Sequence, residues 1–151
     1  MCVSAKRTMN ATTRLPSLAR HFGASVVIAN LSPAGWELVD DVALVLSELA
    51  NLAMSTPATS RVIVSVLIHI DEIELSVRAT APGSSADAVQ VDDITTQLLT
   101  DATVAWGLRD ADDGYEAWAR LACDAEYALG VACDRRTATS GGINKSRDLR
   151  S

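Results

Sequence analysis

A strictly alternating stretch, residues 61–70, constrains the fold of this chain more than any other feature. All of its even positions are valine or isoleucine, which is typical of a strand that buries one face. A second alternating stretch, residues 73–79, follows directly after the polar pair Asp71 and Glu72. The two stretches are therefore predicted to form a β-hairpin that turns at this pair.

Two apolar stretches of helical period come before the hairpin. Residues 15–31 and residues 36–54 repeat their apolar side chains at spacings of three and four. Asp40 and Asp41 lie near the start of the second stretch, where carboxylates stabilise the helix dipole. The Ser-Pro-Ala-Gly sequence at residues 32–35 predicts a turn between two helices.

A third helix is expected after the hairpin. Residues 81–91 begin with Pro-Gly-Ser-Ser and are predicted to be a loop. Asp92 or Asp93 can cap a helix that continues to about Ala105, and Ile94 belongs to its predicted apolar face.

A second hairpin is predicted from residues 106–110 and 115–123, which flank an Asp-Gly turn dipeptide. The three carboxylates of this turn, Asp110, Asp112 and Asp113, are interpreted as solvated acids, because no glutamate follows at calcium-loop spacing. Hairpins combined with helices on one face predict an α+β fold. We expect a two-layer sandwich with a mixed or antiparallel sheet.

One domain is expected from 151 residues. Residues 1–14 are polar and are predicted to be either flexible or an edge strand. Residues 15–132 would form the domain, with a short helix at residues 124–132. Residues 133–151 are predicted to be a flexible basic tail.

The composition excludes several classes of function. The net charge of −6 argues against direct nucleic-acid binding over the whole surface. Three cysteines without a C-x-x-C spacing indicate free thiols in a reducing compartment. The longest apolar run is about half of the ~20 residues that a membrane-spanning helix needs. We therefore expect a cytoplasmic protein that does not bind membranes.

Several stretches resemble a known family. Residues 41–53 are similar to its long helix, usually written Ser-Glu-Leu-x-x-Asn-Ala, and residues 75–83 to its Val-x-Asp-x-Ser/Gly-x-Gly strand and loop. Residues 98–108 and 114–121 are similar to its closing helix and hairpin, with Trp-Gly and Trp-x-x-Leu. The family is the histidine-kinase-like ATPase fold, in particular the actinobacterial single-domain anti-sigma factors and serine kinases.

The resemblance implies a nucleotide site, and this chain departs from its pattern. Glu48 stands where the family has a catalytic carboxylate, but the magnesium-binding amide four residues later is replaced by Leu52. Asn51 is the nearest amide and lies about 100° away around the helix. Ala79 replaces the aspartate that accepts the adenine amino group, whereas Gly83 is retained. Glu48, Asn51 and Gly83 are therefore vestigial site candidates, with Glu48 the catalytic and Asn51 the metal candidate.

Two further departures concern the phosphates. No glycine occurs between Gly83 and Gly107, so the lid glycines are missing, and Glu116 at the family's hydroxyl position would repel phosphate. Each lost charge-assisted hydrogen bond costs roughly 1.5–3 kcal/mol, or one to two decades in affinity. We therefore expect no cofactor.

These departures favour a regulatory protein-binding module, an anti-sigma factor-like protein that has lost most of its ATP-binding residues. By resemblance its partner would be a sigma factor or an anti-anti-sigma factor, and a homodimer is a further expectation. The first two helices and the segment before them would offer the surface. The alternative is a serine kinase that binds Mg-ATP through Glu48 and Asn51 and acts on an anti-anti-sigma antagonist. A structural subunit, with these two residues as polar borders of a helix, is a third possibility.

Overall fold

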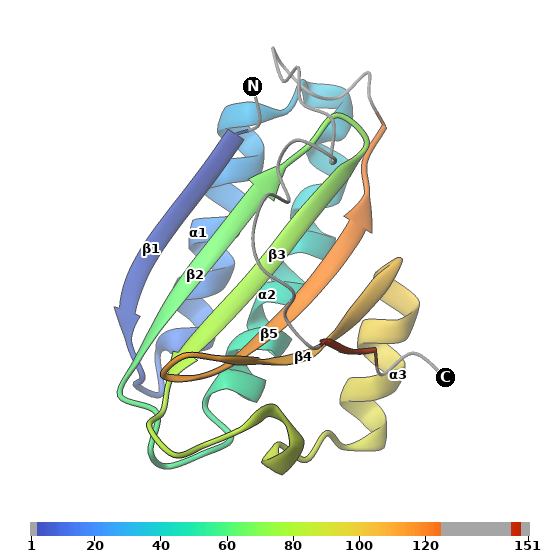
Figure 1. Cartoon of the computed structure of the whole chain (residues 1–151). Helices are drawn as coiled ribbons and strands as arrows, with labels where there is room; N and C mark the ends of the chain where they lie inside the picture. The colour runs from blue at the N-terminus through green and yellow to red at the C-terminus, as the bar shows by residue number, and fades with distance from the viewer. Residues whose placement is uncertain (1–2, 125–145, 149–151) are drawn as a thin grey trace.

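The chain folds into a two-layer α+β sandwich, with an antiparallel sheet in one layer and three helices on one face of it (Figure 1). The computed structural model describes residues 3–124 and 146–148. The predicted fold class is confirmed, and residues 1–14 contain an edge strand. The helix predicted at residues 124–132 and the predicted tail lie outside the described residues, apart from the short strand at 146–148.

The elements follow the predicted order, helix, helix, strand, strand, loop, helix, strand, strand, after the first strand. The strands are β1 (Val3–Asn10), β2 (Arg61–Ile68), β3 (Glu72–Thr80), β4 (Ala105–Ala111), β5 (Gly114–Ala122) and β6 (Ser146–Asp148). The helices are α1 (Leu15–Asn30), α2 (Leu38–Ala53) and α3 (Asp93–Ala102), with short 3₁₀ helices η1 (Pro33–Glu37) and η2 (Ala86–Ala88).

The sheet has the order β1-β2-β3-β5-β4-β6, and every neighbouring pair is antiparallel. Both predicted hairpins are confirmed. In the first hairpin the chain turns earlier than predicted, because His69 N donates to Glu72 O at 2.8 Å and thereby closes the turn. Ile70 consequently lies in the turn and is 41% exposed, so its predicted inward position is wrong.

The core lies between the sheet and the helices, and α2 crosses its centre (Figure 1). Seven residues of α2 are buried: Val42, Val45, Leu46, Leu49, Ala50, Leu52 and Ala53. Each large aliphatic side chain buried in this way stabilises the fold by about 1.5–3 kcal/mol. Gly23 allows α1 to pack closely against α2, because a Cβ at this position would lie 2.3 Å from Leu46 Cδ1.

The third helix begins as predicted and ends early. Asp92 is its N-cap, since its Oδ1 accepts from Thr95 N at 2.7 Å, and this backbone hydrogen bond lowers the pKa of the carboxyl group. The helix ends at Ala102, so its predicted extension to Ala105 is wrong. Ile94 is 80% exposed and does not belong to the buried face, contrary to the prediction.

Candidate functional site

A pocket of about 340 Å³ lies between the end of α2 and the loop that follows β3. Its walls are residues 55–57 after α2, Ser84 and Ser85, and residues 88–90, and Tyr115 also lines it. None of the lining residues is charged. The pocket therefore offers hydroxyl, amide and backbone groups to a ligand, without a side-chain cation or carboxylate.

Tyr115 fills the space between β5 and the end of α2. Its side chain is fully buried, and its hydroxyl donates to Leu52 O at 2.8 Å and to Ala53 O at 3.0 Å. These carbonyls belong to the last turn of α2, and each has a second donor. Leu52 O also accepts from Ser55 N at 3.2 Å, and Ala53 O also accepts from Thr59 Oγ1 at 2.8 Å. Tyr115 thus caps α2 from the sheet, and its burial raises the pKa of the phenol.

Tyr115→Phe tests this cap through pH. At pH 7 the variant should lose about 0.5–1.5 kcal/mol of unfolding free energy, because the hydrogen bonds of the hydroxyl are lost while both carbonyls keep another donor. A phenol pKa raised in the folded state means that the hydroxyl's contribution is complete below the unfolded pKa of about 10. Urea unfolding at pH 7 to 11 should therefore show the difference between wild type and variant shrinking above pH 10. A difference that stays constant to pH 11 would contradict the raised pKa.

Ala79 and Tyr115 are paired across β3 and β5. Ala79 is buried on the helix-facing side of the sheet and has no side-chain acceptor. By the resemblance, an adenine would be recognised at this position. The neighbouring aromatic ring of Tyr115 occupies space on the same side of the sheet, and the sequence reasoning did not identify it.

The predicted site residues do not line this pocket. Glu48 is half-buried and Asn51 is exposed, both on the side of α2 that points away from the sheet. Gly83 is exposed with φ +79°, and no atom lies within 4 Å of a Cβ built on it. None of the three is among the residues that line the pocket between α2 and the loop. Among the described residues, no group of three or more His, Cys, Asp or Glu side chains could hold a metal ion.

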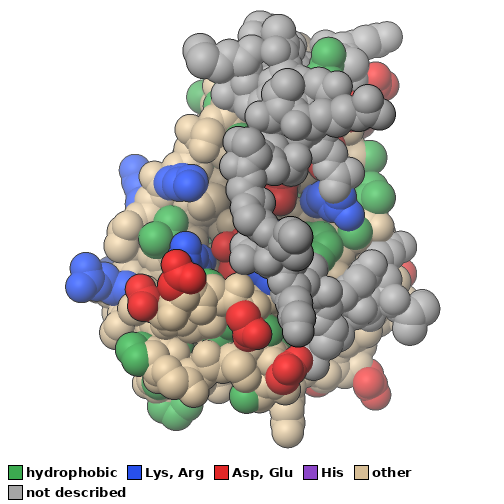
Figure 2. Space-filling view, viewed as in Figure 1, with side chains coloured by type: hydrophobic (Ala, Val, Ile, Leu, Met, Phe, Trp, Pro, Cys, Tyr) green, Lys and Arg blue, Asp and Glu red, His purple; other side chains and the backbone are tan. Residues whose placement is uncertain are grey.

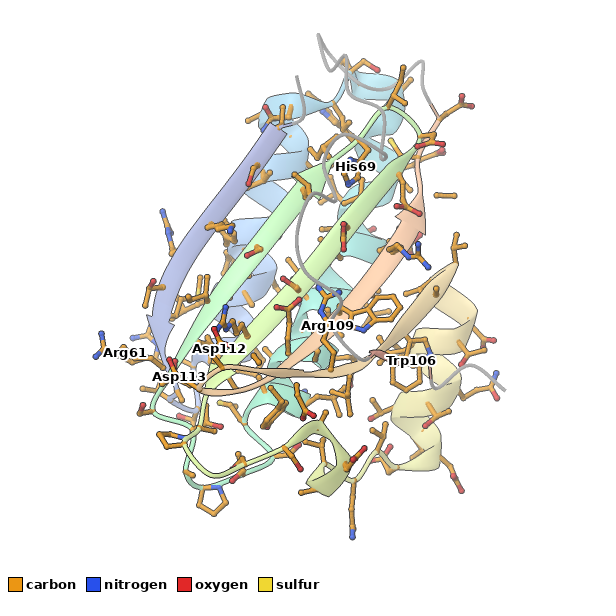
Figure 3. All side chains as sticks on the ribbon, viewed as in Figure 1. Arg61, His69, Trp106, Arg109, Asp112 and Asp113 are labelled. Atoms are coloured by element: carbon orange, nitrogen blue, oxygen red, sulfur yellow. The ribbon has the colours of Figure 1, made fainter. Side chains whose placement is uncertain are left out.

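The predicted repulsion between Glu116 and a phosphate is wrong. The strand register turns Glu116 to the sheet face opposite the helices, where Arg109 Nε donates to its Oε1 at 2.9 Å. Arg109 projects from β4 on this face (Figure 3), and its guanidinium lies 5.8 Å from the Trp118 ring centre. Arg120 lies 5.4 Å from the same ring. Glu116 therefore belongs to an arginine–tryptophan cluster on the far side of the sheet from the pocket.

Asp110 anchors the loop that forms one wall of the pocket. Its Oδ1 accepts from Ala86 N at 2.8 Å, so the interpretation of this residue as a merely solvated acid is wrong. Asp112 fits that interpretation better, since it is exposed and its nearest cation, Arg78 Nη2, is 4.0 Å away. The bond at Asp110 holds the loop to β4, and the contact between Thr56 Oγ1 and Ser84 Oγ at 3.4 Å holds it to the segment that follows α2.

Neither a scan against protein-family models nor a search of curated proteins found a match to this sequence. Among the helices that the structure describes, none has the length and apolar character needed to cross a membrane.

Proposed function

We propose that this protein is a regulatory protein-binding module, similar to an anti-sigma factor, that works without a bound nucleotide. The observation that carries the proposal is Tyr115. Its ring lies beside Ala79, where the resemblance would put an adenine, and its hydroxyl is already engaged by the end of α2. A nucleotide would have to displace a buried ring that also caps a core helix.

The charges around the pocket support the same proposal. A triphosphate needs cations, a metal ion or converging N–H groups to offset the loss of its hydration. The pocket lining contains no Lys or Arg, and the metal candidate Asn51 is not part of it. A chain that retains the sandwich without these groups is better suited to presenting a surface than to phosphoryl transfer.

The competing function is the serine kinase with Mg-ATP. The pocket itself favours it, because about 340 Å³ falls within the usual size of small-ligand sites. This alternative requires Glu48 and Asn51 to act on a phosphate from outside the pocket lining.

Isothermal titration of the whole chain with Mg-ATP separates the two functions. We expect no heat of binding at millimolar nucleotide, either for wild type or for Asn51→Ala. Gln90→Ala, which alters the pocket lining and not the metal candidate, is the matched control. Micromolar binding that Asn51→Ala abolishes would establish the kinase. Pull-down of a sigma factor or an anti-anti-sigma factor by the wild-type chain would support the proposed function, and its absence would count against that partner class.

A further inference from the structure

The first 36 residues of the chain are basic although the whole chain is acidic. They contain Lys6, Arg7, Arg14 and Arg20, and all 19 Asp and Glu residues come later. This segment forms β1 and α1, and the neighbouring strand β2 also contains no acidic residue. In Figure 2, Lys and Arg side chains gather along the side of the molecule where β1 lies. One edge of an acidic protein therefore carries a group of cations, and among the described residues none of these four forms an ion pair.

β1 is the last strand at this end of the sheet, and the described part of the chain provides no strand beyond it (Figure 1). Ala11 N donates to Ser60 O, and residues 11 and 60 continue the β1–β2 register. In an antiparallel pair every second residue bonds to the neighbour, so the odd-numbered residues of β1 bond to β2. Ser4, Lys6 and Thr8 consequently direct their backbone N–H and C=O groups to the open edge.

A partly apolar groove runs beside this edge, between β1 and α1. Its volume is about 290 Å³, and it is lined by Arg7, Met9, Leu18, His21, Phe22 and Ser25. Leu18 is 42% exposed, and the Arg7 guanidinium lies 5.4 Å from the centre of the Phe22 ring. Arg14 lies one helical turn before Leu18, on the same side of α1. The groove thus combines an apolar floor with cations beside it.

We propose that the β1 edge binds an extended acidic segment of a partner protein by strand addition. Backbone groups of the segment would pair with Ser4, Lys6 and Thr8, and its alternate side chains would point into the groove. The apolar side chains of the segment would contact Met9 and Leu18. On the opposite face of the sheet its carboxylates would lie beside Lys6, and a carboxylate on the groove side would lie beside Arg7 or Arg14. The inference rests on the protein-binding function proposed above and specifies its surface and the chemistry of the partner.

Charge selects this occupant over two others. If two copies paired antiparallel through β1, registers near the strand centre would bring Lys6 and Arg7 opposite each other or opposite themselves, and like charges facing across strands are destabilising. The C-terminal tail of the same chain has the wrong sign, since residues 134–151 contain five Lys and Arg residues and two aspartates. An acidic extended segment satisfies both the backbone groups and the charge.

The test is a selection of random 12-residue peptides, displayed on phage, against the whole immobilised chain. The selected peptides should be enriched in Asp and Glu alternating with β-branched residues. Fluorescence anisotropy with the most enriched peptide should then show binding that weakens as salt rises. Thr8→Pro should lower affinity about tenfold or more, because it removes an edge N–H and places a ring there while leaving the β1–β2 bonds intact.

Thr8→Val is the matched control, because it keeps the N–H and should bind the peptide as wild type does. Arg7→Glu should lower affinity by about fivefold or more, through charge rather than backbone. Equal thermal unfolding midpoints of Thr8→Pro and Thr8→Val would exclude a folding defect. Should Thr8→Pro bind equally well, or the selected peptides not be acidic, the proposal is overturned.

Two results would assign the edge to another occupant and would also overturn the proposal. One is a dimer of the free chain in sedimentation that Thr8→Pro dissociates. The other is a labelled duplex DNA that binds wild type and is lost in Lys6→Glu. A sigma factor that binds Thr8→Pro as tightly as wild type would leave the protein-binding function standing and remove this edge as its site.

Discussion

Gly114→Ala is expected to lower the free energy of unfolding by about 3 kcal/mol or more. A Cβ at this position would lie 2.2 Å from Ala79 O and 2.9 Å from Ala81 N. Both are backbone atoms of the neighbouring chain segment and cannot rotate away as the end of a side chain can. Relief therefore requires β3 and β5 to separate where Thr80 pairs with Gly114.

Urea unfolding followed by tryptophan fluorescence measures this effect, and Gly83→Ala is its control. Gly83 has φ +79° and nothing within 4 Å of a Cβ, so its substitution adds only the conformational strain of about 1–2 kcal/mol. Gly114→Ala should therefore be clearly the less stable of the two variants. Equal stabilities would show that the close approach between the strands is not required.

The position of Gly114 links fold stability to the candidate site. Gly114 is the first residue of β5 and directly precedes Tyr115. The backbone carbonyl of the residue before it, Asp113, accepts from Ala81 N at 2.7 Å. Ala81 starts the loop that closes the pocket, so the close approach at Gly114 sets where that loop leaves the sheet. We expect Gly114→Ala to disturb the Tyr115 cap as well as the hairpin.

The helices and hairpins were predictable because the hydrophobic periods are strong. Alternation in residues 61–70 and the three-four spacing in residues 36–54 each match one kind of element. Element ends were less predictable. The third helix stops at Ala102 because Thr103 takes an extended conformation, with φ −127° and ψ 160°, which a periodic pattern does not reveal.

The role of Tyr115 was not predictable from the sequence. Both faces of β5 carry large apolar residues, since Tyr115 and Leu121 face the helices and Trp118 faces the opposite side. The alternation therefore does not say which face is inward. The pairing of Tyr115 with Ala79 depends on a register between strands 36 residues apart along the chain, and a shift by one residue would have turned Glu116 inward instead.

For the basic edge, the sequence shows the charge but not where it lies in the fold. The absence of acidic residues in the first 36 positions is visible in the sequence, but its meaning depends on sheet order. β1 becomes an edge only because β2 and β3 pair with each other and β3 continues to β5. The charge of the segment does not by itself predict strand addition. That prediction also requires the sheet order and register, which leave the backbone groups of Ser4, Lys6 and Thr8 at the open edge.

Tyr115→Ala is expected to lower the free energy of unfolding by about 3–5 kcal/mol, the usual cost of removing a buried aromatic ring. Tyr115→Phe removes only the hydroxyl, so the difference between the two variants measures the ring's packing against Ala79 and the end of α2. The ring also suggests a rescue experiment. Phenol in millimolar excess should raise the unfolding midpoint of Tyr115→Ala and leave wild type unchanged, because a ligand stabilises only the state that binds it.

The rescue experiment also tests the hypothesis that the Tyr115 ring fills the space in which a related protein would bind adenine. If Tyr115→Ala gains stability from adenosine as well as from phenol, the space beside Ala79 is large enough for a base once the ring is gone. Wild type should show no gain from either compound, since its own ring fills that space. A wild-type chain stabilised by adenosine would show instead that Tyr115 moves aside, and the nucleotide-free function would then be wrong.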